Sequence, residues 1–370
     1  MTIDLVMLRN QVQNNCDISD ANHSGLFSLC GLLLRLRDLY KSEQNLRPWE
    51  EPEPAALLEW IDAREKRWEG LIGMDFQSIS LGGESFDPFD VAAINERLRP
   101  SGLVYGAGFA VGMKPSFFLG ELVHSQTLER LTIDTIDREL VRDLFVTPAL
   151  RQGSRIFARR SAMLFFLWDQ VAEMRPSARQ ALAYAFGQHD IEVEEIRRLP
   201  MQLATELQSV ADSELDTWIY HEIGEVKESG FPGQIWHEIV STYSNGPIEI
   251  FARVLKDLLA DTHTGGLLGH IIQHRLSSSL GFFVSFIRPF TRLLFPEVIE
   301  AFDQFMLAGD WSTIEKAREA GHTKAHDYAE ILVGLHEAGR KHGPQWAESR
   351  IMSTIMEPLG IIRDSDEEPR

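Results

Sequence analysis

The chain of 370 residues carries 36 basic and 55 acidic side chains, which gives a formal net charge of −19, and 44% of its residues are hydrophobic. The acidic balance argues against binding to nucleic-acid backbones or to anionic lipid, because both need basic patches. The hydrophobic content can form a sizeable core, and at roughly 150 residues per domain the length favours two domains, with one large domain as the alternative.

The cysteines and the apolar runs indicate a soluble, cytoplasmic protein. Cys16 and Cys30 are too few for a disulfide framework, so a reducing compartment is expected. The first residues lack the basic and apolar regions of a secretory signal. The longest apolar runs, "AMLFFLW" and "LGFFVSFI", are well short of the ~20 residues that cross a bilayer. We therefore expect neither membrane insertion nor nucleic-acid binding.

Helical spacing dominates the first part of the chain. Residues 24–44, "SGLFSLCGLLLRLRDLYKSEQ", repeat leucines at helical intervals and predict a deeply buried helix. A proline-rich linker over 47–54 leads into a second predicted helix over 55–72. Residues 102–136 are instead rich in Gly, Val, Phe and Thr, which predicts a small β-hairpin of two or three short strands.

The remainder returns to helical spacing. Residues 138–145 ("RELVRDLF") and 154–174 ("SRIFARRSAMLFFLWDQVAEM") predict helices, and further helices follow to about residue 342. The expected fold class is mainly α, a multi-helix bundle-like array with a small β-hairpin insertion. The expected division is residues 1–145 for the N-terminal helices plus hairpin, 146–360 for an all-helical C-terminal domain, and 361–370 for a charged tail.

One stretch of the expected C-terminal domain, "WIYHEIGEV" over residues 218–226, concentrates a histidine and two carboxylates. At about 100° per residue, Glu222 projects inside the apolar arc, Glu225 at its edge and His221 near its rim. Side chains spaced i, i+3 and i+4 can converge on one ion, so His221 and Glu225 are candidate metal ligands and Glu222 a candidate catalytic base. The stretch begins like the zinc-protease motif H-E-x-x-H, but Glu225 replaces the second histidine and argues against peptidase activity.

The helix over residues 24–44 supplies a second set of polar candidates. Glu43 and Arg37 both project into its leucine face. Burying a charge alone costs several kcal/mol, so each must be paired or metal-bound. Glu43 is therefore a candidate metal ligand, and Arg37 a candidate buried ion-pair partner.

A third set lies in "THTGGLLGHIIQHRLSSSLGFF", residues 262–283. Arg275 projects into the apolar arc of this predicted helix, and His270 and His274 form an i, i+4 pair along its edge. If this helix packs on the Glu222 helix, Arg275 is an ion-pair partner and the two histidines are metal ligands. The alternative for the histidines is a pair of rings packed on apolar neighbours.

Two other histidine patterns are discounted. His322, His326, Glu330 and Glu337 share one helical stripe, but Tyr328 and Leu332 lie on the opposite face, so the stripe is expected to face water. Glu121 and His124 have E-x-x-H spacing in a segment that predicts strand rather than helix.

Five blocks of the sequence together resemble an uncharacterised bacterial family of mostly helical proteins of unknown function. The resemblance covers most of the chain and implies no catalytic residues. An all-helical chain with internal glutamates and histidines is also similar, in architecture alone, to di-iron carboxylate proteins. The blocks are "HSGLFSLCGLLLRLRDLYKSE", "KPSFFLGEL", "RELVRDLF", "YHEIGE" and "LLFPEVIEAF".

Two functions remain open. The first is a metal-binding protein with a buried carboxylate and histidine pocket, acting as an iron-, zinc- or manganese-dependent oxidoreductase or hydrolase on a small molecule. The second is a non-catalytic binding or scaffold protein, in which the buried charges are structural ion pairs and a protein is the partner. No nucleotide cofactor is expected, since the chain has neither a P-loop nor a G-x-G-x-x-G motif.

Overall fold

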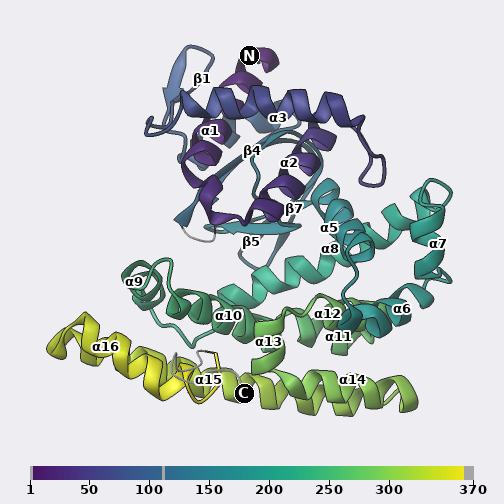
Figure 1. The fold of residues 1–370 in the computed structure, drawn as a ribbon, viewed down its shortest axis with the longest axis vertical. Coiled ribbons are helices and arrows are strands. Elements are labelled where there is room, and N and C mark those ends of the chain that lie inside the picture. The colour runs from purple at the N-terminus through teal and green to yellow at the C-terminus, as the bar shows by residue number, and fades with distance from the viewer. Residues whose placement is uncertain (1–2, 111–112, 362–370) are drawn as a thin grey trace. The chain divides into compact units, whose positions relative to one another are not determined.

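The computed structural model describes residues 3–110 and 113–361, and its chain divides into two compact units (Figure 1). The N-terminal unit comprises Met1–Glu173 and Glu194–Asp216, and the C-terminal unit comprises Met174–Val193 and Thr217–Arg370. Among the described residues, none of the helices has the length and apolar character needed to cross a membrane.

The N-terminal unit is a five-stranded sheet covered by helices (Figure 1). Helices α1 and α2 contact the sheet, and both also contact α3. The helices are α1 (Leu5–His23), α2 (Leu29–Glu43), α3 (Pro54–Glu69), α4 (Val91–Leu98), α5 (Arg160–Ala172) and most of α7 (Val193–Arg198), with the 3-10 turns η1 (Ser24–Leu26) and η2 (Arg99–Ser101). Helix α8 (Ala204–Lys227) begins in this unit and ends in the other.

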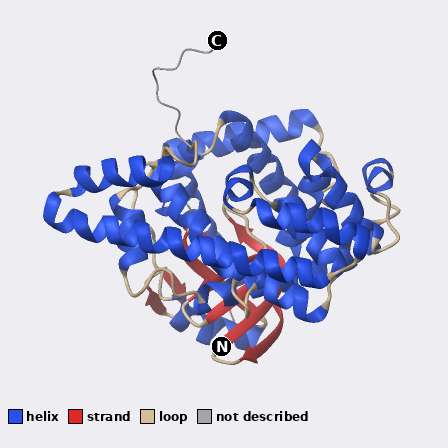
Figure 2. Cartoon of the chain, turned by 90° about the horizontal axis from the view of Figure 1, so that it is seen from below, coloured by secondary structure: helices blue, strands red, loops and turns tan. Residues whose placement is uncertain are grey.

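All described strands belong to the N-terminal unit (Figure 2). The sheet has the order β3-β4-β5-β7-β6, in which β5 and β7 run parallel and the other neighbours antiparallel. A separate hairpin joins two short strands through glycines at positive φ. The strands are β1 (Ile79–Leu81), β2 (Glu84–Phe86), β3 (Leu103–Phe109), β4 (Pro115–Leu128), β5 (Leu131–Arg142), β6 (Ala149–Gln152) and β7 (Arg155–Arg159).

Successive side chains of β4 serve two cores because strand residues alternate between the faces of a sheet. Phe117 packs with the apolar side of α1, including Leu8 and Val12. Its neighbour Phe118 packs with Phe157 on the opposite face.

The described residues of the C-terminal unit form helices and no strands. The longest, α15, has 32 residues and packs against α10, α14 and α16 (Figure 1). Gly309 ends α14 at a positive φ, and the Asp310 side chain caps α15. The elements are η4 (Pro176–Ala178), α6 (Arg179–Gly187), α9 (Ile235–Thr242), α10 (Pro247–Thr262), α11 (Leu267–His274), α12 (Ser277–Phe286), α13 (Pro289–Leu294), α14 (Pro296–Ala308), α15 (Trp311–His342), α16 (Pro344–Ile351) and η5 (Met352–Met356).

The β structure is larger than the expected hairpin at residues 102–136. The segment "RELVRDLF", predicted as helix, instead completes β5 and begins the loop after it. Glu, Leu and Arg favour helices, but Glu139, Val141 and Arg142 pair with β4, and this tertiary pairing overrides local propensity. The sheet also continues past residue 145, the expected end of the N-terminal part.

Helix α1 was not predicted, and the deep burial expected for α2 is only partly correct. The buried face of α1 includes Asn15, Asp17 and Asp20, so its apolar stripe is narrower than that by which helices are recognised. In α2 the last turns are buried, whereas Leu29 is 75% exposed.

Candidate metal centre

Helices α8 and α10 approach closely at Gly224. A Cβ atom at this position would lie 2.2 Å from the carbonyl oxygen of Ala260, so a larger residue would push the helices apart. Close to this contact along the chain are His221 and Glu225 on α8, and Asp257 on α10. Their side chains gather because glycine lets the two backbones nearly touch.

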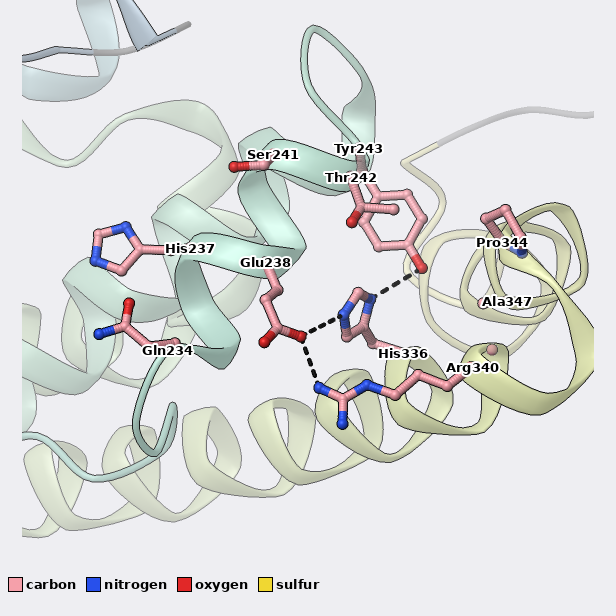
Figure 3. A pocket seen from close by; sticks show the side chains of 11 residues that line it. Gln234, His237, Glu238, Ser241, Thr242, Tyr243, His336, Arg340, Pro344 and Ala347 are labelled. Carbon is pink, nitrogen blue, oxygen red and sulfur yellow. Dashed lines mark hydrogen bonds and ion pairs between the residues drawn. The ribbon is translucent and has the colours of Figure 1, made fainter.

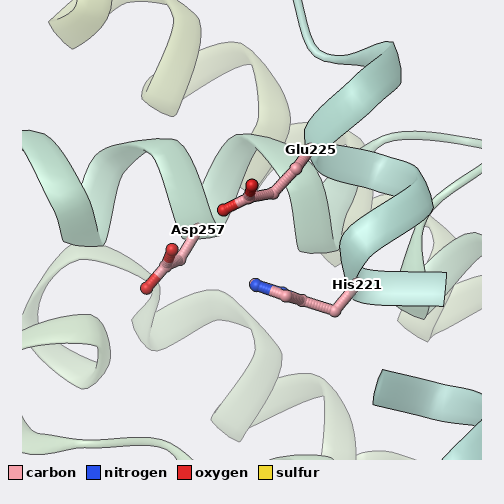
Figure 4. Close-up of side chains that lie close together, drawn as sticks. All are labelled: His221, Glu225 and Asp257. Carbon is pink, nitrogen blue, oxygen red and sulfur yellow. The ribbon is translucent and has the colours of Figure 1, made fainter. Parts of the chain in front are cut away.

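His221, Glu225 and Asp257 form a three-residue group of potential metal ligands (Figure 4). Each offers one ligand atom, and these atoms lie within 4.8 Å of one another. The imidazole points toward the space between the two carboxylates. Its Nδ1 lies 2.7 Å from Oδ1 of Asp261, also on α10. Oε2 of Glu225 lies 2.9 Å from Nζ of Lys256.

The group carries more negative than positive charge. Glu225, Asp257 and Asp261 supply three carboxylates, and Lys256 supplies one ammonium. Burial lowers the pKa of His221, but the charge and hydrogen bond of Asp261 outweigh burial and hold this pKa well above its ordinary value. The imidazole therefore tends to hold a proton and to act as the second cation.

The pKa of Asp257 is raised in part by the same excess of carboxylates. Its side chain is exposed on one side, yet dense packing raises its pKa. The charge of His221 lowers this pKa, Glu225 and Asp261 raise it, and the result is about 6. A cation placed between the carboxylates would favour their charged forms.

The projected positions on α8 agree with the structure. Glu222 is buried, with 9% of its surface exposed, while His221 and Glu225 are intermediate. Glu222 is not a member of the three-residue group, but its charge contributes to the raised pKa of His221.

The histidines of α11 lie beside α8 without joining the group. The ring of His270 stacks on Tyr220, with ring centroids 3.7 Å apart, and lies 4.7 Å from the ring of His274. Burial and the neighbouring histidine lower the pKa of His270 to about 4. Arg275 is exposed at the end of α11, where the backbone turns left-handed, so it does not project into the apolar arc as expected.

Glu43 and Arg37 belong to the N-terminal unit, where each pairs with a side chain of opposite charge. The residue Glu43 is exposed, and its carboxylate bonds Arg64 and the Nε1 of Trp60, the latter at 2.9 Å. Arg37 lies 3.5 Å from Asp38. Local projection failed here because Glu43 is the final residue of α2, where the helical surface meets α3.

Sequence reasoning missed Asp257 and Asp261. Their i, i+4 spacing on one helix was an available signal, since it repeats the spacing of His221 and Glu225. What the sequence did not supply was the pairing of α8 with α10.

A second polar site lies in a groove of about 550 Å³ between α9 and the end of α15 (Figure 3). Nδ1 of His336 lies 3.3 Å from the hydroxyl of Tyr243, and Nε2 lies 3.7 Å from Oε2 of Glu238. Arg340 donates to the same Glu238 oxygen at 2.7 Å. Burial lowers the pKa of His336 despite the nearby Glu238. A neutral imidazole can then accept a hydrogen bond from Tyr243 and donate toward Glu238.

His336 and Glu238 were also missed. His336 continues the buried positions Ala325, Ala329 and Leu332 along α15 at helical spacing. This made it detectable as a polar residue on an apolar face.

The most enclosed charges in the described chain lie in the N-terminal unit. Lys114 lies 3.0 Å from Oδ1 of Asp20, 3.2 Å from Oδ2 of Asp143 and 3.0 Å from Oγ of Ser19. Backbone amides of Phe117, Phe145 and Leu144 complete the carboxylates' hydrogen bonds. We call Lys114, Asp20 and Asp143 the Lys114 cluster.

Residues 7–159 match the N-terminal domain, and residues 164–354 the C-terminal domain, of a family of unknown function (DUF6866). The chain belongs to this family. In the sequence, the boundary between the two matched domains follows the end of β7. The expected resemblance to an uncharacterised family is confirmed. No curated protein and no solved structure matches the chain.

Proposed function

We propose that the C-terminal unit binds a zinc, manganese or iron ion through His221, Glu225 and Asp257. The observation that carries this proposal is the convergence of their ligand atoms to within 4.8 Å across two helices. One imidazole with two carboxylates suits these ions better than copper(I) or calcium. Small side-chain rotations would shorten the separations to those of a coordinated ion.

Asp261 orients the histidine for this role. A metal-binding histidine usually hydrogen-bonds a carboxylate through one ring nitrogen and coordinates through the other. The 2.7 Å contact between Nδ1 of His221 and Asp261 supplies the first half of that arrangement. It leaves Nε2 as the coordinating atom.

The raised pKa of His221 predicts the pH dependence of binding. A histidine must lose its proton to coordinate, so the metal competes with the proton. Because the pKa of His221 lies well above 6.5, affinity should increase as pH rises from 6 to 8. A site whose histidine titrated near its ordinary value would reach full affinity at lower pH.

The proposal extends to metal-dependent chemistry on a small molecule, either hydrolytic or oxidative. The exposed side of Asp257 gives the group an approach from solvent. A metal would supply Lewis-acid activation there. Glu222, next to His221, is the candidate to accept a proton from a bound reactant.

Metal analysis of protein purified without added metal tests the binding step. We expect near-stoichiometric zinc, manganese or iron in the wild type and loss of most of it in Asp257→Asn and His221→Ala. His326→Ala is the matched control, since His326 and Glu330 also form an i, i+4 pair, at 3.4 Å, on α15. A folded wild-type protein that holds none of these metals and binds none on titration would refute the proposal.

The alternative is a non-catalytic binding protein whose groove takes an organic ligand. It is favoured by the groove volume of about 550 Å³, which lies in the range of small-molecule sites. Under this alternative, Lys256–Glu225 and His221–Asp261 are structural ion pairs. Asp257→Asn should then leave the metal content unchanged.

A further inference from the structure

The groove between α9 and the end of α15 contains a buried histidine whose two ring nitrogens face different partners (Figure 3). His336 is 8% exposed, and its Nδ1 lies 3.3 Å from the hydroxyl of Tyr243. When this hydroxyl donates to Nδ1, the neutral ring carries its proton on Nε2. Tyr243 is equally buried, so packing around both side chains fixes the orientation of the imidazole.

The second ring nitrogen of His336 faces a carboxylate across a small gap. Nε2 lies 3.7 Å from Oε2 of Glu238, which is longer than a hydrogen bond. A donor and an acceptor at this separation fit a hydroxyl group between them, because a hydroxyl accepts through its oxygen and donates through its hydrogen. A ligand hydroxyl can therefore accept from Nε2 of His336 and donate to Glu238.

Arg340 extends this arrangement to a neighbouring hydroxyl. Its guanidinium donates to Oε2 of Glu238 at 2.7 Å. A guanidinium has five N–H donors and a carboxylate accepts about four hydrogen bonds, so this contact uses only part of either group. Both groups are planar, and their remaining donors and acceptors have fixed directions. Adjacent hydroxyls on one ring match such a pair, since one accepts from the guanidinium while the other donates to the carboxylate.

The charges of the groove favour a neutral ligand. Among the described residues that line it, the carboxylate of Glu238 and the guanidinium of Arg340 pair with each other. Burial lowers the pKa of His336 despite the nearby Glu238, which favours the neutral imidazole. The lining therefore offers no surplus cation to a phosphate and no surplus carboxylate to an amine. Its other polar groups are hydroxyls, an amide and an imidazole, from Gln234, His237, Ser241, Thr242 and Tyr243.

The apolar part of the groove is made of small residues where α15 meets α16. Gly339, Pro344 and Ala347 line it. A Cβ atom on Gly339 would lie 2.6 Å from the Cβ of Ala347, so the two helices approach closely here. The small apolar surface fits the C–H face of a ring, and the groove volume of about 550 Å³ is in the range of small-molecule sites.

We infer that this groove binds a neutral sugar, whose ring hydroxyls are held by His336, Glu238 and Arg340. Few directed polar groups beside an apolar wall are the usual composition of a small-molecule site. The inference rests on the alternative function described above and gives its ligand a chemical class. The groove shares no residue with the proposed metal centre. Sugar binding and metal content are therefore separate measurements, and failure of either proposal leaves the other intact.

Ligand-observed NMR titration of the full chain tests the inference. The neutral probes are D-glucose, D-galactose and D-mannose, and the charged probes are the amino and 6-phosphate derivatives of each. We expect at least one neutral hexose to bind at millimolar concentrations and its charged derivatives to bind more weakly. Glu238→Gln should weaken binding about tenfold or more, because it removes a charged hydrogen-bond acceptor. The variant should fold, since Glu238 and Arg340 are both well exposed and such pairs contribute little to stability.

Glu84→Gln is the matched control, because Glu84 pairs with Arg97 at 2.6 Å and these side chains are about as exposed as Glu238 and Arg340. Its affinity for the hexose should stay within about twofold of wild type. The metal content of Glu238→Gln should equal that of the wild type. Failure of all three neutral hexoses to bind, tighter binding of a charged derivative, or equal losses in the two variants would overturn the inference.

Discussion

The Lys114 cluster of the N-terminal unit and the metal-ligand group of the C-terminal unit both contain charged side chains inside the protein. The two groups differ in the partners of these charges and in their access to solvent. Nζ of Lys114 is surrounded by oxygens of Asp20, Asp143, Ser19 and Pro115, and Lys114 is only 1% exposed. Backbone N–H groups donate hydrogen bonds to the carboxylates of Asp20 and Asp143. A network with its donors and acceptors matched in this way stabilises a fold and leaves no position for a ligand.

The metal-ligand group likewise holds one carboxylate more than it holds cations. Its three carboxylates lie near one ammonium, that of Lys256. The raised pKa of His221 favours the protonated imidazole, which is the second cation. Asp257 also reaches solvent, whereas Asp143 is fully buried. The comparison teaches that burial of charge alone does not mark a binding site. The two groups differ in access from solvent, which the metal-ligand group has and the Lys114 cluster lacks.

Removing Lys114 should have the largest effect. In Lys114→Met the carboxylates of Asp20 and Asp143 remain buried without their cation, and breaking a buried ion pair in this way costs about 3–5 kcal/mol. We expect a loss of this size in the free energy of unfolding measured with urea. Lys114→Met/Asp20→Asn should recover part of it, because it removes one of the two stranded charges.

Lys66→Met is the surface control for Lys114→Met. Lys66 pairs with Asp62 at 2.5 Å, but both side chains are mostly exposed, and such pairs contribute little. Its unfolding curve should nearly superimpose on wild type. Equal effects of the two substitutions would contradict a structural role for the Lys114 cluster.

The pH dependence of stability should sharpen the comparison next. Burial raises the pKa of Asp20 to about 7, against the opposing effect of Lys114, from an ordinary value of 3.8. The folded state therefore holds a proton that the unfolded state releases between these values. The stabilisation is complete below pH 3.8 and is lost as pH rises through about 7, at no more than about 1.4 kcal/mol per pH unit.

Asp20→Asn should flatten this decline, because asparagine does not titrate. The measurement is the urea midpoint at pH 5, 6, 7 and 8. Asp257→Asn, with its change in the other unit, should leave the midpoint of the N-terminal unit unaltered at each pH. The same slope in Asp20→Asn and wild type would show that another group sets the dependence.

Local features were predictable from the sequence where a single helix determined them. The burial of Glu222, and the edge positions of His221 and Glu225, follow from the 3.6-residue period of α8. The same reasoning failed for Glu43 and Arg275, which lie at the last residue of α2 and just after α11. Helical projection holds only inside a helix, and the ends were not known.

Features that depend on distant segments were not predictable in this way. The first residues of "RELVRDLF" form a strand because they pair with β4. Helix α1 was hidden because Asp20 and its polar neighbours face a buried lysine 94 positions along the chain. Asp257 joins His221 only because α10 packs on α8. In each case the deciding partner is remote in sequence.

Gly224→Ala should produce a smaller loss of stability but a selective one. The added Cβ would lie 2.2 Å from the backbone oxygen of Ala260, so α8 and α10 must separate. Overpacking of this kind costs about 1–3 kcal/mol. If the proposed metal centre exists, the separation should also remove the bound metal, measured by elemental analysis of the folded variant.

Gly334→Ala provides the opposite expectation and the smallest effect. Gly334 lies within α15, and a Cβ there would meet nothing within 4 Å. Alanine is favoured over glycine inside a helix by about 0.5–1 kcal/mol, so this variant should be slightly more stable and keep its metal. A Gly224→Ala protein that matched it in both stability and metal content would show that the close approach of α8 and α10 does not position His221, Glu225 and Asp257.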